Sequence, residues 1–150
     1  MSRGKSDDPF QLERFIKAQE GIYDIALSEL QTGRKHSHWM WFIFPQIDGL
    51  ARSSTAAYFA IRSIDEAKAY LEHPVLGSRL RECTSTLLNL NHASASDVFG
   101  YPDDLKFCSS MTLFDHAASE FDLFEDAIIR YCAGERDPKT LAILHGKTKL

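Results

Sequence analysis

The chain has 150 residues, of which 44% are hydrophobic and 25% are charged, as in an ordinary globular protein. Its formal net charge of −4 excludes the broad basic surface that nucleic acid binding needs. The longest apolar run, Trp39–Pro45, is far shorter than the roughly 20 residues of a membrane helix. The N-terminus also lacks the apolar core of a signal peptide. We therefore predict a soluble, cytoplasmic protein that binds neither nucleic acid nor a membrane.

The first predicted element is a long helix. Asp8 can cap it and Pro9 suits its first position. Apolar residues then recur at intervals of three and four between Leu12 and Leu30, which predicts one amphipathic helix of about six turns. Gly21 is a weak point within this helix, and Gly33 ends it.

The segment from 33 to 49, GRKHSHWMWFIFPQIDG, contains both tryptophans of the chain. Its apolar centre has the length of a buried strand, but a strand needs a partner for its backbone groups, and no second alternating run is found. We therefore predict a short buried helix that is capped at Ser37 and ends before Pro45, because proline disfavours helix in the residue before it.

The remaining chain continues as helices separated by capping residues, glycine and proline. Together they predict an all-α fold of about six to seven helices with no substantial sheet. The single helical domain spans residues 8–146, with a disordered N-terminal tail at 1–7 and a C-terminal tail at 147–150. The predicted starts are a capping box from Ser63 to Glu66, Pro74, Tyr101-Pro102, Ser119 and Asp137-Pro138.

Cysteine and histidine spacing argues against metal and disulfide sites. Cys83, Cys108 and Cys132 are odd in number, widely spaced and without a Cys-x-x-Cys pair, so we predict reduced thiols. The six histidines lack His-x-x-x-His spacing, and no glycine-rich phosphate loop is present. We therefore predict no metal and no cofactor.

Four segments of the sequence are distinctive: DDPFQLERFIKAQ, GRKHSHWMWFIFPQIDGL, EAKAYLEHPVLGSRLREC and VFGYPDDLKFCSSMTLF. They resemble the bacterial and fungal family of domains of unknown function numbered 1810, over nearly the whole chain. The resemblance implies a compact, mainly α-helical domain without an established biochemical role. Some relatives carry the label calpastatin, but calpastatins are disordered inhibitors and this chain has the capped, periodic pattern of a folded domain.

The first candidate site is the polar entry to the apolar run, at residues 34–38. A helix that begins near Ser37 would offer free N–H groups and a positive dipole end, and Arg34, Lys35 and the histidines would add donors for an anion. Alternatively, Arg34 and Lys35 only complement the C-terminal dipole of the preceding helix. For His38, the alternatives are ligand contact and a buried, hydrogen-bonded imidazole.

The second candidate lies on the predicted helix over residues 103–116. Lys106 and Ser110 are four residues apart on one flank, and three hydroxyl side chains in mid-helix are unusual. Lys106 could bind an anion together with Ser109 and Ser110, or it could position a hydroxyl group. The alternative is that the small residues let a neighbouring helix approach, while Lys106 is solvated or paired with Asp103.

We predict one concave site between the 34–46 segment and the 104–112 helix, for a small anionic or nucleotide-like molecule. His38, Lys106 and Ser110 are the candidate acid–base or anion-binding groups. Most of the aromatic run is expected in the core, with the tryptophan adjacent to His38, Trp39, as the exception. The complete candidate set is Arg34, Lys35, His38, Trp41, Phe44, Gln46, Asp104, Lys106, Ser109 and Ser110.

Two other functions fit the sequence. One is a helical interaction module or homodimer, using an aromatic face or the acidic residues Glu120, Asp122, Glu125 and Asp126. The other is an enzyme that processes an ADP-ribose-like substrate. Neither a reaction nor its absence follows from the sequence.

Overall fold

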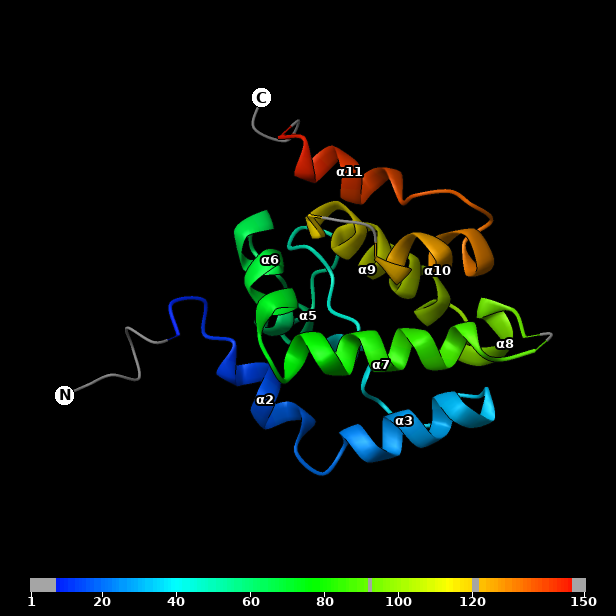
Figure 1. The fold of residues 1–150 in the computed structure, drawn as a ribbon. Helices are drawn as coiled ribbons and strands as arrows, with labels where there is room; N and C mark the ends of the chain where they lie inside the picture. Colours follow the sequence, from blue (N-terminus) through cyan, green and yellow to red (C-terminus); the bar gives the residue numbers. More distant parts are fainter. Residues whose placement is uncertain (1–7, 92, 120–121, 147–150) are drawn as a thin grey trace.

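The computed structural model describes residues 8–91, 93–119 and 122–146, and the expectations for both tails and Glu120 lie outside these residues. The described residues form ten helices, and their only bridge outside helices joins Ile47 and Ile61. The all-α prediction is confirmed, but the helices are shorter and more numerous than the predicted six to seven (Figure 1). They are α2 (Glu13–Gln19), α3 (Tyr23–Thr32), α4 (Met40–Ile43), α5 (Ser54–Phe59), α6 (Ile64–Glu72), α7 (Leu76–Leu88), α8 (Ala95–Phe99), α9 (Asp103–Ala117), α10 (Leu123–Tyr131) and α11 (Pro138–Leu144).

The predicted six-turn helix is two helices, α2 and α3. Gly21 lies between them with φ of +73°, a left-handed conformation that ends a helix. The prediction that Pro9 is the first helical residue was wrong, since α2 begins at Glu13 after its N-cap Leu12. The Asp8 carboxylate nevertheless accepts hydrogen bonds from the N–H groups of Leu12 and Glu13, at 2.7 and 2.9 Å. Gly33 ends α3 as predicted, with φ of +83°.

Two cap predictions were wrong. Helix α4 begins after Trp39, because the Ser37 hydroxyl bonds elsewhere. Helix α10 is capped by Asp122 and not by Ser119, since the Asp122 side chain accepts from the N–H of Leu123 at 2.8 Å. Helices α5 and α8 were not predicted, because five or six residues are too few to establish a periodic pattern.

Helix α7 lies at the centre of the fold, between α3 on one side and α10 on the other (Figure 1). Helix α9 packs against α6 and α10, and α11 covers its outer side. Helices α6 and α7 approach each other closely at Gly77 on α7. A Cβ atom there would lie 2.1 Å from the carbonyl oxygen of Leu71, at the end of α6. Glycine is therefore required by packing at this position.

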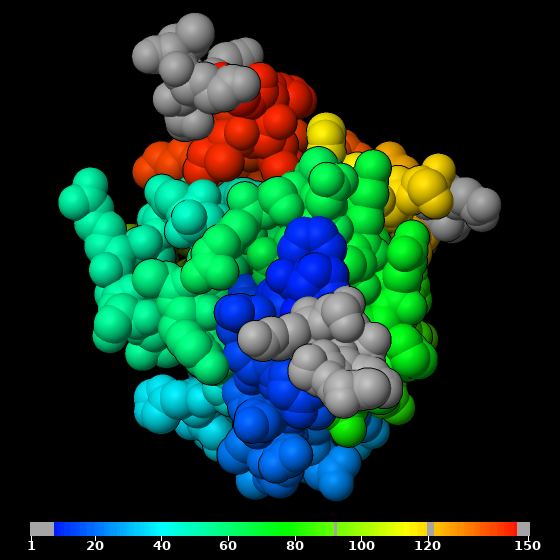
Figure 2. All heavy atoms as spheres, turned by 90° about the vertical axis from the view of Figure 1, so that its left-hand side faces the viewer, coloured from blue at the N-terminus to red at the C-terminus, as the bar shows by residue number. Residues whose placement is uncertain are grey.

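A buried ion pair joins the N-terminal segment to α6. Arg14 Nη2 lies 2.7 Å from Glu66 Oε2, and both side chains are at most 5% exposed. Figure 2 shows this N-terminal segment lying across the face of the molecule beside the green helices. The Glu66 carboxylate therefore does not complete the predicted capping box, although the backbone N–H of Glu66 still donates to the Ser63 hydroxyl. The Arg14 guanidinium also donates to the carbonyl oxygens of Phe10, Gln11, Tyr58 and Ala60.

None of the helices formed by the described residues is long and apolar enough to cross a membrane.

Candidate functional site

The polar entry at 34–38 is organised around Glu29, a residue of α3 that the sequence analysis did not select. One carboxylate oxygen accepts from the N–H groups of His36 and Ser37, at 2.9 and 3.0 Å. The same oxygen accepts from the indole Nε1 of Trp39 at 2.9 Å, and the other accepts from the Ser37 hydroxyl at 2.6 Å. Backbone N–H groups near Ser37 thus do bind a carboxylate, as expected, but it is a side chain of the protein, and the other donors to it are Ser37 and Trp39 side chains and not the predicted arginine, lysine and histidine side chains.

The electrostatics of Glu29 agree with this geometry. Partial burial raises the pKa of the carboxyl group, but the hydrogen bonds from Ser37, His36 and Trp39 outweigh burial and lower the pKa to about 2. Arg34 and His38, in contrast, are exposed. Of the two alternatives for His38, a buried imidazole is therefore excluded.

The predicted 34–46 segment and the start of α9 do lie together. Lys35 Nζ is 2.8 Å from Asp103 Oδ2, and Lys106 Nζ is 3.4 Å from Asp103 Oδ1. The Lys106 ammonium also lies 3.9 Å from the centre of the Trp41 ring. We call Lys35, Trp41, Asp103 and Lys106 the Trp41 cluster. In this cluster two ammonium groups share one carboxylate beside a half-buried indole.

The two lysines of the Trp41 cluster are held differently. The Lys35 side chain is only 8% exposed, and its backbone N–H donates to the carbonyl oxygen of Val98 at 2.7 Å. Its ammonium lies 5.1 Å from the centre of the buried Trp39 ring. Lys106 is more exposed and makes the longer contact with Asp103. Lys106 is therefore the cation that an incoming molecule can reach with less rearrangement.

Phe44 belongs to the core. Its ring is fully buried and contacts the rings of Phe99 and Phe107 edge to face, with centroids 5.9 and 5.1 Å apart. Trp39 is also fully buried, whereas Trp41 is partly exposed. Most of the aromatic run is core, as expected, but the exception is Trp41 and not Trp39, the tryptophan beside His38 that was expected to be the exception.

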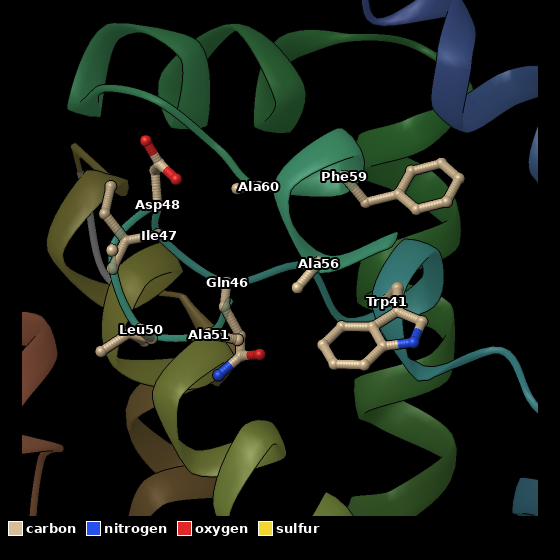
Figure 3. Close-up of a pocket in the computed structure, with 10 residues that line it drawn as sticks. Trp41, Gln46, Ile47, Asp48, Leu50, Ala51, Ala56, Phe59 and Ala60 are labelled. Atoms are coloured by element: carbon tan, nitrogen blue, oxygen red, sulfur yellow. The ribbon is translucent and has the colours of Figure 1, made fainter. Parts of the chain in front are cut away.

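Trp41 and Gln46 meet at a small crevice with residues 47–51 and α5 (Figure 3). Its volume is about 10 Å³, which is room for about one water molecule. A nucleotide does not fit inside this crevice. A ligand of the Trp41 cluster would therefore lie on the surface, against the exposed part of the indole.

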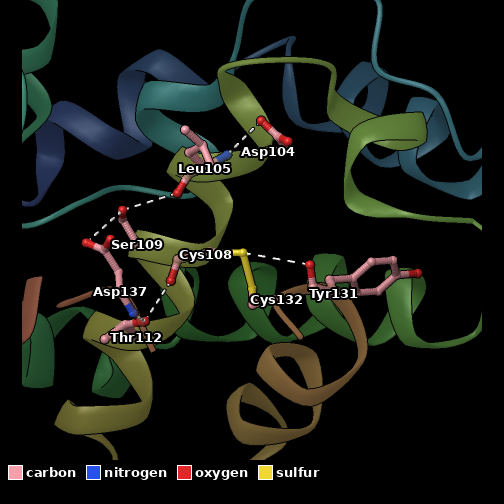
Figure 4. Close-up of a disulfide and its surroundings, with 8 residues drawn as sticks. All are labelled: Asp104, Leu105, Cys108, Ser109, Thr112, Tyr131, Cys132 and Asp137. Atoms are coloured by element: carbon pink, nitrogen blue, oxygen red, sulfur yellow. Dashed lines mark hydrogen bonds between the residues drawn. A yellow bond between two sulfur atoms is a disulfide. The ribbon is translucent and has the colours of Figure 1, made fainter. Parts of the chain in front are cut away.

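The hydroxyl groups of α9 are explained by α11, which covers them. Asp137, the N-terminal cap of α11, accepts from the Ser109 hydroxyl at 3.2 Å (Figure 4). It also accepts from the Thr140 hydroxyl at 2.6 Å. Its backbone N–H donates to the Thr112 hydroxyl at 2.9 Å. Ser110 is fully buried, and its hydroxyl has no hydrogen-bond partner within the described residues. Ser109 and Thr112 thus dock a neighbouring helix, the alternative that the sequence left open.

The prediction that all cysteines are reduced was wrong for two of them. Cys108 on α9 and Cys132 after α10 form a disulfide, with Cα atoms 5.9 Å apart (Figure 4). Their spacing of 24 residues gave no signal, because the packing of α9 against α10 brings them together. Cys83 remains a free thiol, and its burial raises its pKa to about 12. Such a thiol is unreactive at neutral pH.

Within the described part of the chain, no three His, Cys, Asp or Glu side chains come close enough to hold an ion together. Asp104 lies at the start of α9, where its carboxylate accepts from the N–H of Leu105 at 2.9 Å. Three charged groups of the candidate site, Lys35, Asp103 and Lys106, pair with one another.

These features define a compact, all-α protein with a cationic and aromatic cluster on its surface. The chain belongs to a family described as a protein of unknown function, DUF1810, whose profile matches residues 9–144. It is also similar to the conserved hypothetical protein Rv1873 from Mycobacterium tuberculosis, known from a crystal structure. The identity is 46%, the match covers 92% of this chain and 99% of that chain, and the TM-score is 0.90. No curated protein matches significantly.

Proposed function

We propose that the protein binds a small anionic molecule with a planar, aromatic part at the Trp41 cluster. The observation that carries this proposal is that Lys35 and Lys106 share the single carboxylate of Asp103 beside a partly exposed indole. The cluster itself keeps an uncompensated positive charge. Phosphate and carboxylate groups pair with ammonium groups, and an indole offers a face for a planar ring.

Binding requires a change of partner at Lys106. Its contact with Asp103 is 3.4 Å, compared with 2.8 Å for Lys35, so it is the weaker of the two ion pairs. An anion replaces Asp103 as the partner of Lys106, while Lys35 keeps Asp103 in place. The Lys106 ammonium lies over the Trp41 ring, so a ligand's ring stacks on that face of the indole only after the ammonium has moved aside to pair with the ligand's anionic group. Arg34 and His38 are exposed and supply further donors at the edge.

The proposal is for binding and not for turnover. Ser110 is fully buried, and Ser109 is occupied by Asp137. The free thiol, Cys83, is fully buried and carries a raised pKa. An activated nucleophile needs an adjacent base or a lowered pKa. Processing of an ADP-ribose-like molecule therefore has less support than its binding.

The test is a thermal-shift and calorimetric titration with phosphate, pyrophosphate, AMP and ADP-ribose. At least one organic anion is expected to raise Tm and to bind more tightly than inorganic phosphate. Lys106→Met removes the charge but keeps the length of the side chain, so it should weaken binding at least about tenfold, the scale of one charge-assisted hydrogen bond. Trp41→Leu should weaken the organic anions but not phosphate.

The matched control is Lys139→Met, which removes an exposed lysine on α11, away from the cluster. This variant should bind like the wild type. If Lys106→Met and Lys139→Met bind the same probe equally well, or if no probe changes Tm, the proposal is wrong.

A second copy of the chain is the alternative partner. Tyr101 and Leu105, at the start of α9, are 81% and 55% exposed, large values for apolar side chains four residues apart. They support a homodimer formed through this end of α9. Light scattering at two concentrations tests it, since a dimer should dissociate on dilution and Leu105→Glu should leave only monomer. A constant monomer mass excludes it.

A further inference from the structure

Two histidines that are far apart in sequence meet at the outer edge of the fold. His116 lies in the last turn of α9, and His145 follows directly after α11. Their ring centroids are 5.8 Å apart, and both residues are exposed. This pairing does not depend on sequence spacing. It arises because α11 docks on α9 through Asp137, Ser109 and Thr112.

The separation of the rings matches that of two imidazoles on one metal ion. A ligating nitrogen lies about 2.1 Å from zinc, and the ring centroid lies about 1.2 Å behind it. Two ligating rings are then about 5.4 Å apart at the tetrahedral angle and about 6.6 Å apart on opposite sides of the ion. The observed 5.8 Å lies between these values, so the separation of the two rings is compatible with binding to one ion. The exposed rings can turn about χ2, which is a broad torsion in histidine.

The surroundings also favour a cation. Both histidines stand at the C-terminal ends of helices, where the partial charge of the helix dipole is negative. Imidazole nitrogen is preferred by zinc, copper and nickel, while magnesium and calcium prefer oxygen ligands. No third protein ligand completes the site among the described residues, so water fills the other positions. An ion held in this way is exchangeable.

We propose that His116 and His145 together bind a divalent transition-metal ion, and that this ion links the C-terminal helix α11 to α9. The site is separate from the Trp41 cluster and does not depend on the function proposed above. Because the ion binds only when α11 is docked, its binding should stabilise the folded chain.

The experiment titrates tag-free protein with Zn²⁺ and, separately, with Mg²⁺. Zn²⁺ at about 100 times its Kd should raise Tm by roughly 5 to 10 °C, and Mg²⁺ should not. His116→Ala and His145→Ala should each weaken Zn²⁺ binding by at least about tenfold. Amide hydrogen exchange should slow in α11 when Zn²⁺ is added, which a site elsewhere would not produce.

The control variant is His36→Ala, which removes another exposed histidine outside the pair. It should bind Zn²⁺ like the wild type. The proposal is overturned if either single variant of the pair binds Zn²⁺ as tightly as the wild type. It is also overturned if Zn²⁺ leaves both Tm and exchange in α11 unchanged, whatever the result at the Trp41 cluster.

Discussion

The Cys108–Cys132 disulfide should make a large contribution to stability. The two cysteines are separated by 24 residues, so the cross-link closes a loop of that length in the unfolded chain. The loop-closure relation gives an entropy loss of about 12 cal/mol/K for the unfolded state, or about 3.5 kcal/mol at 25 °C. For a domain of this size, that corresponds to a change in Tm of roughly 7 to 14 °C.

The assay is thermal unfolding followed by circular dichroism, with and without a thiol reductant. The Tm of the wild type should fall when the disulfide is reduced. The double variant Cys108→Ser/Cys132→Ser should have the lower Tm throughout and should not respond to reductant. The number of free thiols after denaturation without reductant should be one, from Cys83. Three free thiols, or equal Tm for the wild type and the double variant, would refute this reasoning.

Three further perturbations test the packing and the electrostatics. Gly77→Ala should destabilise by about 2 to 3 kcal/mol by overpacking against Leu71, although alanine normally favours a helix. Arg14→Met should cost about 3 to 5 kcal/mol in chemical denaturation, because it leaves the Glu66 carboxylate buried without its partner. Glu29→Gln tests the lowered pKa of the Glu29 carboxyl group. The pKa is about 2 in the folded chain, below the reference value of 4.5. The carboxylate therefore stabilises the fold fully above pH 4.5 and progressively less towards pH 2. The stability difference between the wild type and Glu29→Gln should therefore shrink over that range.

Matched variants separate these effects from general damage. Gly21→Ala introduces the same methyl group where nothing lies within 4 Å, so only the positive φ should cost, about 1 to 2 kcal/mol. Arg14→Met combined with Glu66→Leu should recover part of the stability lost in Arg14→Met, since no unpaired charge remains. If Gly77→Ala destabilises the protein no more than Gly21→Ala does, the explanation by close packing at Gly77 is contradicted. If the stability of the wild type and that of Glu29→Gln depend on pH in the same way, the explanation by the lowered pKa of Glu29 is contradicted.

Local signals in the sequence predicted the helix boundaries where one residue determines the backbone. Gly33 ends α3, and Asp137 with Pro138 begins α11, because these residues have strong intrinsic preferences. Gly21 shows the limit of the method. The apolar pattern runs through it, whereas in the fold α2 packs against α4 and α3 packs against α7, and the chain turns at Gly21 between them.

The sequence predicted which segments form the candidate site, but not which atoms in them contact one another. The approach of residues 34–46 to α9 was expected, and Lys106 does pair with Asp103, one of the alternatives considered. The role of Glu29 could not be predicted, because it depends on the loop folding back over α3. The hydroxyl groups of α9 were misleading for the same reason, since the helix that covers them lies more than 25 residues further along the chain. Distant contacts of this kind leave no local pattern.

The most direct test of the proposed function is the indole N–H signal of Trp41 in a ¹H–¹⁵N NMR titration with an aromatic anion such as AMP. The signal is assigned by its loss in Trp41→Phe. It should shift in saturable fashion in the wild type and shift much less in Lys106→Met at the same AMP concentrations, while the signal of the buried Trp39 moves little in both. An unchanged Trp41 signal in the wild type, or an equal shift in Lys106→Met, would contradict the assignment of ligand binding to the Trp41 cluster.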